Sequence, residues 1–236
     1  QILIMRFARS PLLRRCGGRA FSVGRPVARN LLLFERQELA GSDSTRLNLS
    51  PGAELDSLES VSVKLQPSDG RAEHITRVLK SSRGDFVRVG LVNGCRGTAR
   101  VVEAGSAGVE LSFEEWEEPH ARPRLDLLLA MPRPKVLRRL WRPLAQIGLH
   151  RIFIVGADKV ERYYFDSRAL TPSVYEEEMR AGLEQAKDTL MPEVIVHRRL
   201  SPALDVFAQE GEGGDGVRRA RILAHPLGAA GEAALG

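Results

Sequence analysis

The hydrophobic positions of residues 125–155 follow the pattern of a strand, a helix and a second strand. Residues 125–130 (LDLLLA) and 151–155 (RIFIV) are short, nearly continuous apolar runs. Such runs are typical of strands that are buried on both faces of a parallel sheet. Between them, Pro134 suits the first turn of a helix, and Gly148 suits the residue that ends it. The pattern therefore predicts a βαβ crossover unit.

The same alternation of elements continues toward the end of the chain. A capping box at Ser173 and Glu176 predicts the start of a helix that ends before Pro192. Two further strands and a helix are predicted over residues 193–196, 220–224 and 202–209. Alternating strands and helices imply an α/β domain with a mainly parallel sheet and right-handed crossovers.

The preceding part of the chain predicts a different architecture. Short strands are predicted over residues 30–34, 60–65, 86–89 and 98–102, and a short helix near residues 75–79. Asn93-Gly94 is a hairpin signal between the last two strands. The glutamate-rich residues 103–118 predict an edge strand that leads into a linker. We therefore expect a small β-barrel-like domain that ends near residue 121.

Charge is distributed unevenly along the chain. The 236 residues carry a formal charge of +5, but the first 34 contain seven arginines and no acid, which leaves 28 basic against 30 acidic residues in the rest. An arginine-rich, acid-free start is typical of an organellar transit peptide, and Arg19-Ala20-Phe21-Ser22 resembles a mitochondrial processing site. Residues 1–29 are therefore predicted to be a transit peptide, with a disordered basic tail as the alternative. The expected location is the mitochondrion or the plastid.

Two clusters of cations remain on this otherwise slightly acidic protein. Residues 71–100 contain seven cations against two acids, and residues 122–142 contain seven cations against Asp126 alone. Either cluster by itself is better explained by a solvated surface. Together they favour RNA as a partner, because contacts to phosphates require a high local density of positive charge.

Several functional classes lack the residues that they require. The five histidines are scattered and the two cysteines are far apart, so neither a metal site nor a disulfide framework is predicted. Residues 211–216 match G-x-G-x-x-G, but they follow a predicted helix and precede a strand, so we interpret them as a surface loop. No apolar run reaches the roughly 18 residues that span a bilayer, so no membrane association is predicted.

Four segments in a fixed order resemble the ribosomal RNA small-subunit methyltransferase E family. They are EHITRVLK followed by RGD, then LLLAMPRPK, then IGLHRI, and finally GLEQAKDTLMP. The resemblance runs over residues 30–226. It implies a PUA-like RNA-binding β-barrel at residues 30–120 and a SPOUT-type α/β domain at residues 121–236. Family members methylate N-3 of a uridine in small-subunit rRNA, bind S-adenosylmethionine at a deep trefoil knot and form homodimers; those without a transit peptide are cytoplasmic.

The resemblance also implies roles for individual residues. Glu184, Gln185 and Arg162 match catalytic positions, with Lys159 as the alternative to Arg162. The RNA-binding positions are His74, Arg77, Lys80, Arg83, Arg133 and Lys135. For Glu184 the alternative is a solvated helix acid, and for His74 it is a local turn or core role.

One family motif does not appear where it is expected. The glycine-rich segment I-G-P-E-G-G should follow residues 220–226, and the printed sequence has LGAAGEAALG near that point. We therefore expect a C-terminally incomplete member that lacks the knot segment, whose cofactor-binding residues stay unassigned. The alternative function is that of a non-catalytic RNA- or ribosome-binding protein, or an inactive fragment.

Overall fold

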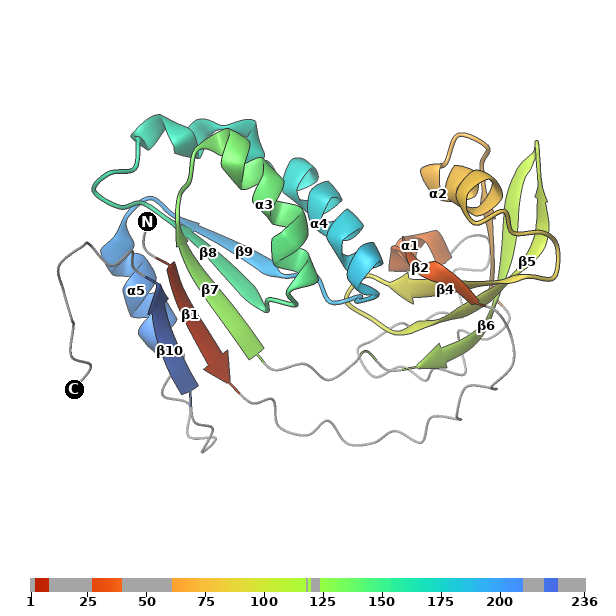
Figure 1. Ribbon diagram of the computed structural model, residues 1–236, viewed down its shortest axis with the longest axis horizontal. Coiled ribbons are helices and arrows are strands. Elements are labelled where there is room, and N and C mark those ends of the chain that lie inside the picture. Colours follow the sequence, from red (N-terminus) through yellow and green to blue (C-terminus); the bar gives the residue numbers. More distant parts are fainter. Residues whose placement is uncertain are drawn as a thin grey trace. The chain divides into compact units, whose positions relative to one another are not determined.

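The computed structural model describes residues 3–8, 27–39, 61–117, 119, 124–209 and 219–224. The chain divides into two compact units, each with its own five-stranded sheet (Figure 1). The first unit comprises residues 1–12, 122–178 and 192–236, and the second comprises residues 13–121 and 179–191. The glycine-rich residues 211–216 and the predicted processing site lie outside the described residues.

The sheet of the first unit has a parallel part and an antiparallel part. Its strands are ordered β10-β1-β7-β8-β9. Their bounds are β1 Leu3–Ala8, β7 Arg124–Ala130, β8 Arg151–Val155, β9 Glu193–His197 and β10 Arg219–Ala224. β7, β8 and β9 pair in parallel, as predicted, but β1 pairs antiparallel with both β7 and β10. The sheet as a whole is therefore mixed rather than mainly parallel.

The antiparallel part of this sheet begins inside the segment predicted to be a transit peptide or disordered. Residues Leu3–Ala8 form β1, which is hydrogen-bonded along both edges, and β2 begins at Val27. Four of the six residues in LIMRFA are large and apolar, so the segment suits a strand as well as it suits a presequence. A targeting role for residues 1–29 stays a prediction.

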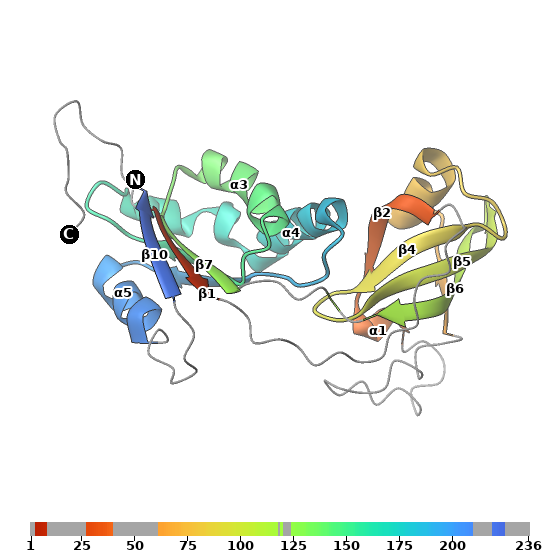
Figure 2. The same ribbon diagram turned by 60° about the horizontal axis from the view of Figure 1, so that its bottom comes forward.

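Helices cover both faces of the parallel strands. α3 (Pro134–Gln146) and α5 (Leu200–Gln209) lie on opposite faces of the sheet (Figure 2). Phe153 of β8 packs edge to face on Phe207 of α5, with the ring centroids 5.3 Å apart. Alternate β8 residues point to opposite faces, and all five are buried, which explains the unbroken apolar run in the sequence.

The helix boundaries agree closely with the sequence signals. Gly148 has a φ of 78°, the left-handed conformation that ends α3 as predicted. α4 (Pro172–Ala186) begins at Pro172 rather than at the predicted cap Ser173, because the carbonyl of Thr171 accepts the first helical hydrogen bonds, from Val174 and Tyr175. No helix among the described residues is long and apolar enough to cross a membrane.

The sheet of the second unit is ordered β2-β4-β5-β6-β3. Its strands are β2 Val27–Phe34, β3 Ser62–Leu65, β4 Phe86–Leu91, β5 Arg96–Gly105 and β6 Gly108–Glu117. Its helical segments are α1 Arg36–Leu39, α2 Gly70–Glu73 and the π-helix η2 His74–Val78. β2 pairs in parallel with β4, and the other pairs are antiparallel. The predicted hairpin across Asn93-Gly94 is confirmed by β4 and β5.

The prediction of an edge strand within residues 103–118 is wrong. β6 carries four of these glutamates, Glu110, Glu114, Glu115 and Glu117, and lies between β5 and β3. Its carboxylates face cations on the neighbouring strands, in the pairs Lys64–Glu110, Arg100–Glu114 and Arg96–Glu117. Cross-strand pairs of opposite charge stabilise an acidic strand between two neighbouring strands of a sheet.

A buried ion pair connects the two central parallel strands of the first unit. Asp126 of β7 and Arg151 of β8 are register partners and are 1% and 3% exposed. The Arg151 guanidinium donates two hydrogen bonds to the Asp126 carboxylate, at 2.7 and 3.2 Å. Breaking such a pair leaves an uncompensated charge in the core, whereas replacing both partners by apolar residues does not.

We expect Asp126→Asn to lower the free energy of unfolding by about 3–5 kcal/mol, since it leaves the Arg151 charge without its counter-charge. The double variant Asp126→Leu with Arg151→Met should be more stable than the single variant. Urea denaturation of the three proteins measures both differences. A double variant that is less stable than Asp126→Asn would contradict this account.

Candidate functional site

The carboxyl ends of the parallel strands in the first unit meet at one edge of the sheet. The N–H of Met131, just after β7, donates to the carbonyl of Val155 at 2.8 Å, and the N–H of Gly156, just after β8, donates to the carbonyl of His197 at 2.9 Å. A Cβ on Gly156 would lie 2.1 Å from the Arg198 carbonyl oxygen, so only glycine allows this approach. Ligands of open α/β sheets bind outside this edge.

A pocket of about 700 Å³ opens at this edge. It is lined by residues that follow β8 and β9: Gly156, Ala157, Asp158, Val160, Arg162, Phe165, Arg198, Arg199 and Leu200. The Arg198 guanidinium donates to Asp166 at 2.6 Å and lies over the Phe165 ring at 5.7 Å from its centroid. The volume suits a nucleoside-sized ligand, and the pocket combines the Phe165 ring with three arginines and the carboxylate of Asp158.

Predicted and unpredicted residues meet in this pocket. Arg162 belongs to the predicted site, and it lines the pocket from the 3-10 helix η3 (Arg162–Asp166). Arg198, Arg199 and Asp158 were not predicted. The signal that could have indicated them is their place directly after predicted parallel strands, since such positions gather at one edge.

A buried tryptophan positions the segment that carries Arg162. Trp141 of α3 is fully buried, and its indole N–H donates to the carbonyl of Ala169 at 2.9 Å. Ala169 lies in η4 (Arg168–Leu170), four residues beyond Phe165, and the Trp141 ring packs on Tyr175 at a centroid distance of 5.3 Å. This anchor restrains the loop between β8 and α4.

Arg133 and Lys135 follow the carboxyl end of β7, as the sequence predicted. Arg133 directly precedes Pro134, the first residue of α3, and both cations are exposed. The first turn of α3 has no acid and no side-chain cap. The helix dipole therefore adds positive potential to that of the two side chains.

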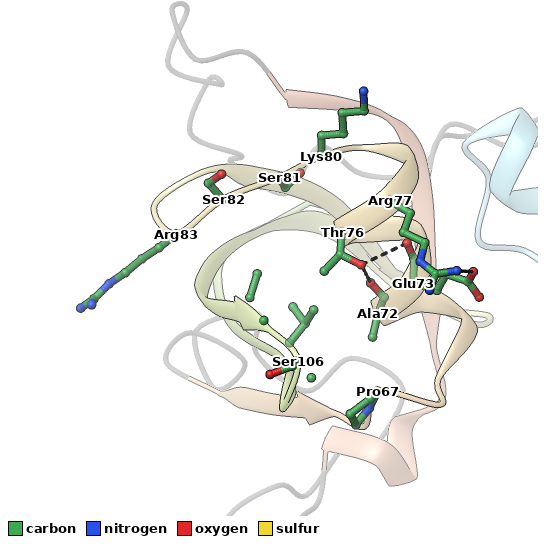
Figure 3. A pocket seen from close by; sticks show the side chains of 14 residues that line it. Pro67, Ala72, Glu73, Thr76, Arg77, Lys80, Ser81, Ser82, Arg83 and Ser106 are labelled. Carbon is green, nitrogen blue, oxygen red and sulfur yellow. Dashed lines mark hydrogen bonds and ion pairs between the residues drawn. The ribbon is translucent and has the colours of Figure 1, made fainter.

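A second hollow, of about 720 Å³, lies in the second unit between η2 and the β5–β6 turn (Figure 3). Arg77, Lys80 and Arg83 line it, but Figure 3 shows Lys80 and Arg83 pointing away from its centre. Arg77 forms an exposed ion pair with Glu73 at 2.7 Å. The floor is formed by small residues such as Ala104 and Gly105. The arrangement is a rim of outward cations rather than a cage for a small anion.

The ion pairs of the second unit reduce the positive surface that the sequence indicated. Of the seven cations in residues 71–100, four are paired with carboxylates: Arg71, Arg77, Arg96 and Arg100. Within the described ranges, the other three, Lys80, Arg83 and Arg88, have no ion-pair partner and are exposed. They are therefore the cations of this unit that are most available to an RNA phosphate.

Glu184 and Gln185 line another small hollow of the second unit, with His74 and Arg71. The Glu184 carboxylate accepts a hydrogen bond from the backbone of Leu33 in the edge strand β2, while Arg71 donates to the Leu33 carbonyl at 3.1 Å. Burial raises the pKa of Glu184, against the effects of that hydrogen bond and of nearby arginines. Glu184 therefore has a structural role at the edge of β2, and its predicted catalytic role stays a prediction.

Arg71 is the centre of the polar network around this hollow. Its guanidinium donates to Asp69 and Glu38 and lies 4.5 Å from the centroid of the Phe34 ring. The hydrogen bond from Arg71 lowers the pKa of Asp69. Burial would raise the pKa of Glu38, but hydrogen bonds from Arg71 and from the Glu35 backbone outweigh it and lower that pKa.

The chain matches known proteins mainly through its first unit. Residues 119–230 match the family described as "RNA methyltransferase domain". This part of the chain is therefore similar to the RNA methyltransferase domain family. The match confirms the resemblance stated from the sequence for this part of the chain.

Two curated relatives are named for ribosomal RNA. The chain is 37% identical over 129 residues to the ribosomal RNA small subunit methyltransferase E of Treponema pallidum, an alignment of 54% of this chain and 48% of the relative. It is 25% identical over 143 residues to the ribosomal RNA small subunit methyltransferase E 1 of Borreliella burgdorferi, with 61% and 60% covered. The chain thus spans about half of the length of the curated relatives that it matches.

Solved structures of low sequence identity are also similar. A probable rRNA-methyltransferase from Porphyromonas gingivalis is 19% identical, with a TM-score of 0.49 and coverage of 60% of this chain and 58% of that one. A ribosomal RNA small subunit methyltransferase E from Neisseria gonorrhoeae, bound to S-adenosyl methionine, is 14% identical, with a TM-score of 0.49 and coverage of 75% and 65%.

We expect Arg71→Met to flatten the pH dependence of stability in the acid range. The pKa values of Asp69 and Glu38 in the folded protein lie below their ordinary values. Their pairing with Arg71 therefore stabilises the fold fully at pH values above the ordinary carboxyl pKa. That contribution is lost as the pH falls through the lowered values. Urea denaturation at several pH values between about 5 and 3, an interval that spans the ordinary carboxyl pKa values, measures the slope of unfolding free energy against pH.

Lys64→Met is the matched control for this experiment. Lys64 is an exposed cation of the same unit with one carboxylate partner, Glu110 at 3.4 Å. Its removal should leave the slope close to that of the wild type. Parallel slopes for the wild type and Arg71→Met would show that the Arg71 network does not set the acid sensitivity.

Proposed function

We propose that this protein transfers a methyl group from S-adenosylmethionine to N-3 of a uridine in small-subunit rRNA. The observation that carries the proposal is the match of residues 119–230 to the RNA methyltransferase domain family, together with 37% identity to an rRNA small subunit methyltransferase E. The pocket at the carboxyl edge of β8 and β9 supports it by its size and its lining.

The described residues of this pocket fit a nucleoside-containing cofactor. Phe165 offers an apolar wall for an adenine, and Asp158 offers a carboxylate for ribose hydroxyls or an amino group. Arg199 offers a cation for a carboxylate, whereas Arg198 is already engaged by Asp166. When bound, S-adenosylmethionine supplies an electrophilic methyl group on a sulfonium.

Arg162 is the described residue with the clearest chemical role. Methylation at N-3 forms an N–C bond, breaks an S–C bond and releases the N-3 proton, so negative charge develops on the uracil ring. A guanidinium held at the pocket by η3 stabilises such charge in a site from which water is partly excluded. Positive charge from Arg133 and Lys135 beside the pocket favours the approach of the phosphate backbone.

Further parts of the proposal extend to the second unit and to assembly. The five-stranded sheet with η2 would act as the PUA-like RNA-binding part, through Lys80 and Arg83 at the rim of its hollow. A homodimer and an organellar location complete the proposal. The organellar location derives from the composition of residues 1–29 alone.

Transfer of tritium-labelled methyl groups from S-adenosylmethionine to small-subunit rRNA tests the activity. Primer extension should then stop at one uridine, because a methyl group on N-3 blocks base pairing. Arg162→Ala should lower the single-turnover rate by about 100-fold, the typical cost of removing one charge-stabilising donor. Arg168→Ala is the control, since Arg168 is an exposed arginine of the neighbouring η4 that does not line the pocket.

Tight rRNA binding without any methyl transfer would contradict the proposal and support the non-catalytic RNA-binding alternative. Equal rates for wild type and Arg162→Ala, with transfer intact, would exclude Arg162 as a catalytic residue.

Binding of small-subunit rRNA at a series of salt concentrations tests the second unit separately. Lys80→Glu with Arg83→Glu should weaken binding and reduce the slope of log K against log salt by about 0.7–0.9 for each lost phosphate contact. Lys64→Glu is the matched control, because Lys64 is an exposed cation of the same sheet that does not line the hollow. An unchanged slope in the double variant would exclude this rim from the RNA interface.

A further inference from the structure

An exposed aromatic side chain belongs to η3, the turn that lines the pocket of the first unit through Arg162 and Phe165. Tyr163 is 66% exposed, whereas Phe165, which lines the pocket, is half-buried. In a 3-10 helix, residues three apart share a face. Arg162 and Phe165 therefore share the face toward the pocket, and Tyr163, which lies between them in this turn, projects from a neighbouring face.

The ring of Tyr163 is held in place by its neighbour. The Tyr163 and Tyr164 rings are 4.8 Å apart between centroids and are inclined at 80°, an edge-to-face arrangement. A hydrogen bond with Tyr164 is the main cause that raises the pKa of the Tyr163 phenol. An edge-to-face pair restricts the rotamer of a ring and leaves an exposed ring with a face open to a further planar group.

Charged groups around Tyr163 come from two elements. The positive charge of Arg133, which follows β7, acts on the Tyr163 phenol, and so does the negative charge of Glu161, which precedes η3. Arg133 is exposed, and it follows the strand next to the one that leads to Tyr163. A preoriented aromatic face, with an exposed arginine that follows the neighbouring strand at the same edge of the sheet, matches what a nucleotide requires, a stacking surface for the base and a cation for its phosphate.

We propose that Tyr163 is a stacking platform for a nucleobase of the RNA substrate, with Arg133 beside it as the contact for the adjoining phosphate. The proposal rests on RNA as the substrate of this unit. It adds a residue that positions the RNA: a base next to the target stacks on Tyr163, which holds the strand while the target uridine enters the pocket. Stacking of this kind does not depend on the identity of the base.

Equilibrium binding without S-adenosylmethionine tests the platform. The probe is a short, uridine-rich single-stranded RNA with a fluorescent label, compared with the same strand carrying abasic sites. Tyr163→Leu should weaken binding of the intact strand about tenfold, within the range measured for single base–aromatic contacts. Tyr163→Phe should bind within about twofold of the wild type, since it keeps the ring.

The abasic strand separates stacking from every other effect. Wild type and Tyr163→Leu should bind it with equal affinity, because the leucine variant and the missing bases remove the same contact. Ile147→Ala is the control for loss of an exposed apolar side chain, since Ile147 is 55% exposed at the end of α3, and it should bind both strands like the wild type.

Three results would overturn the proposal. They are unchanged binding of the intact strand by Tyr163→Leu, an equal loss on the intact and abasic strands, and no binding of the intact strand by the wild type. Methyl transfer is not part of this readout. Transfer with unchanged binding by Tyr163→Leu would therefore refute the platform alone, and absence of transfer with the predicted binding pattern would refute only the proposed reaction.

Discussion

The buried ion pair between Asp126 and Arg151 fixes the register of β7 against β8, and the geometry of the first unit depends on that register. A shift of one residue would turn every side chain of β8 to the other face of the sheet and would separate this pair inside the core. In this register, the N–H groups of Met131 and Gly156 extend the backbone hydrogen bonding of the sheet just beyond the carboxyl ends of β7 and β8. The segments that follow the strands then start from neighbouring points, so a pocket forms there.

In the second unit, ion pairs reduce the positive charge that is available to a partner. The glutamates of β6 neutralise cations that a linear sequence presents as one positive cluster, and Arg71 is engaged by Asp69 and Glu38. Among the described cations of residues 71–100, Lys80 and Arg83 at the rim of the hollow, together with Arg88, are left for a polyanion. The same unit uses Glu184 to satisfy the backbone of its edge strand, so a carboxylate in a predicted catalytic position has a structural task.

Local patterns predicted most elements correctly, because those patterns act over a few residues. The apolar runs of β7 and β8, the proline and glycine that bound α3, and the hairpin at Asn93-Gly94 are local signals. The errors concern pairing partners. β6 has the acidic composition of an edge strand, and β1 has the composition of a presequence, yet each has a strand on both sides. Strand neighbours depend on contacts between distant residues, which composition does not encode.

By itself the sequence determined the two architectures, the βαβ order of the first unit, and the resemblance that the family match confirms for residues 119–230. It also indicated Arg162 and Arg133 as site residues. Only the tertiary structure decided that Asp158 and Arg199 join Arg162 in one pocket, and that Tyr163 stands exposed on the turn that carries Arg162. The reason is physical: parallel pairing brings together loops that are about 40 residues apart in the chain, as a crossover connection requires.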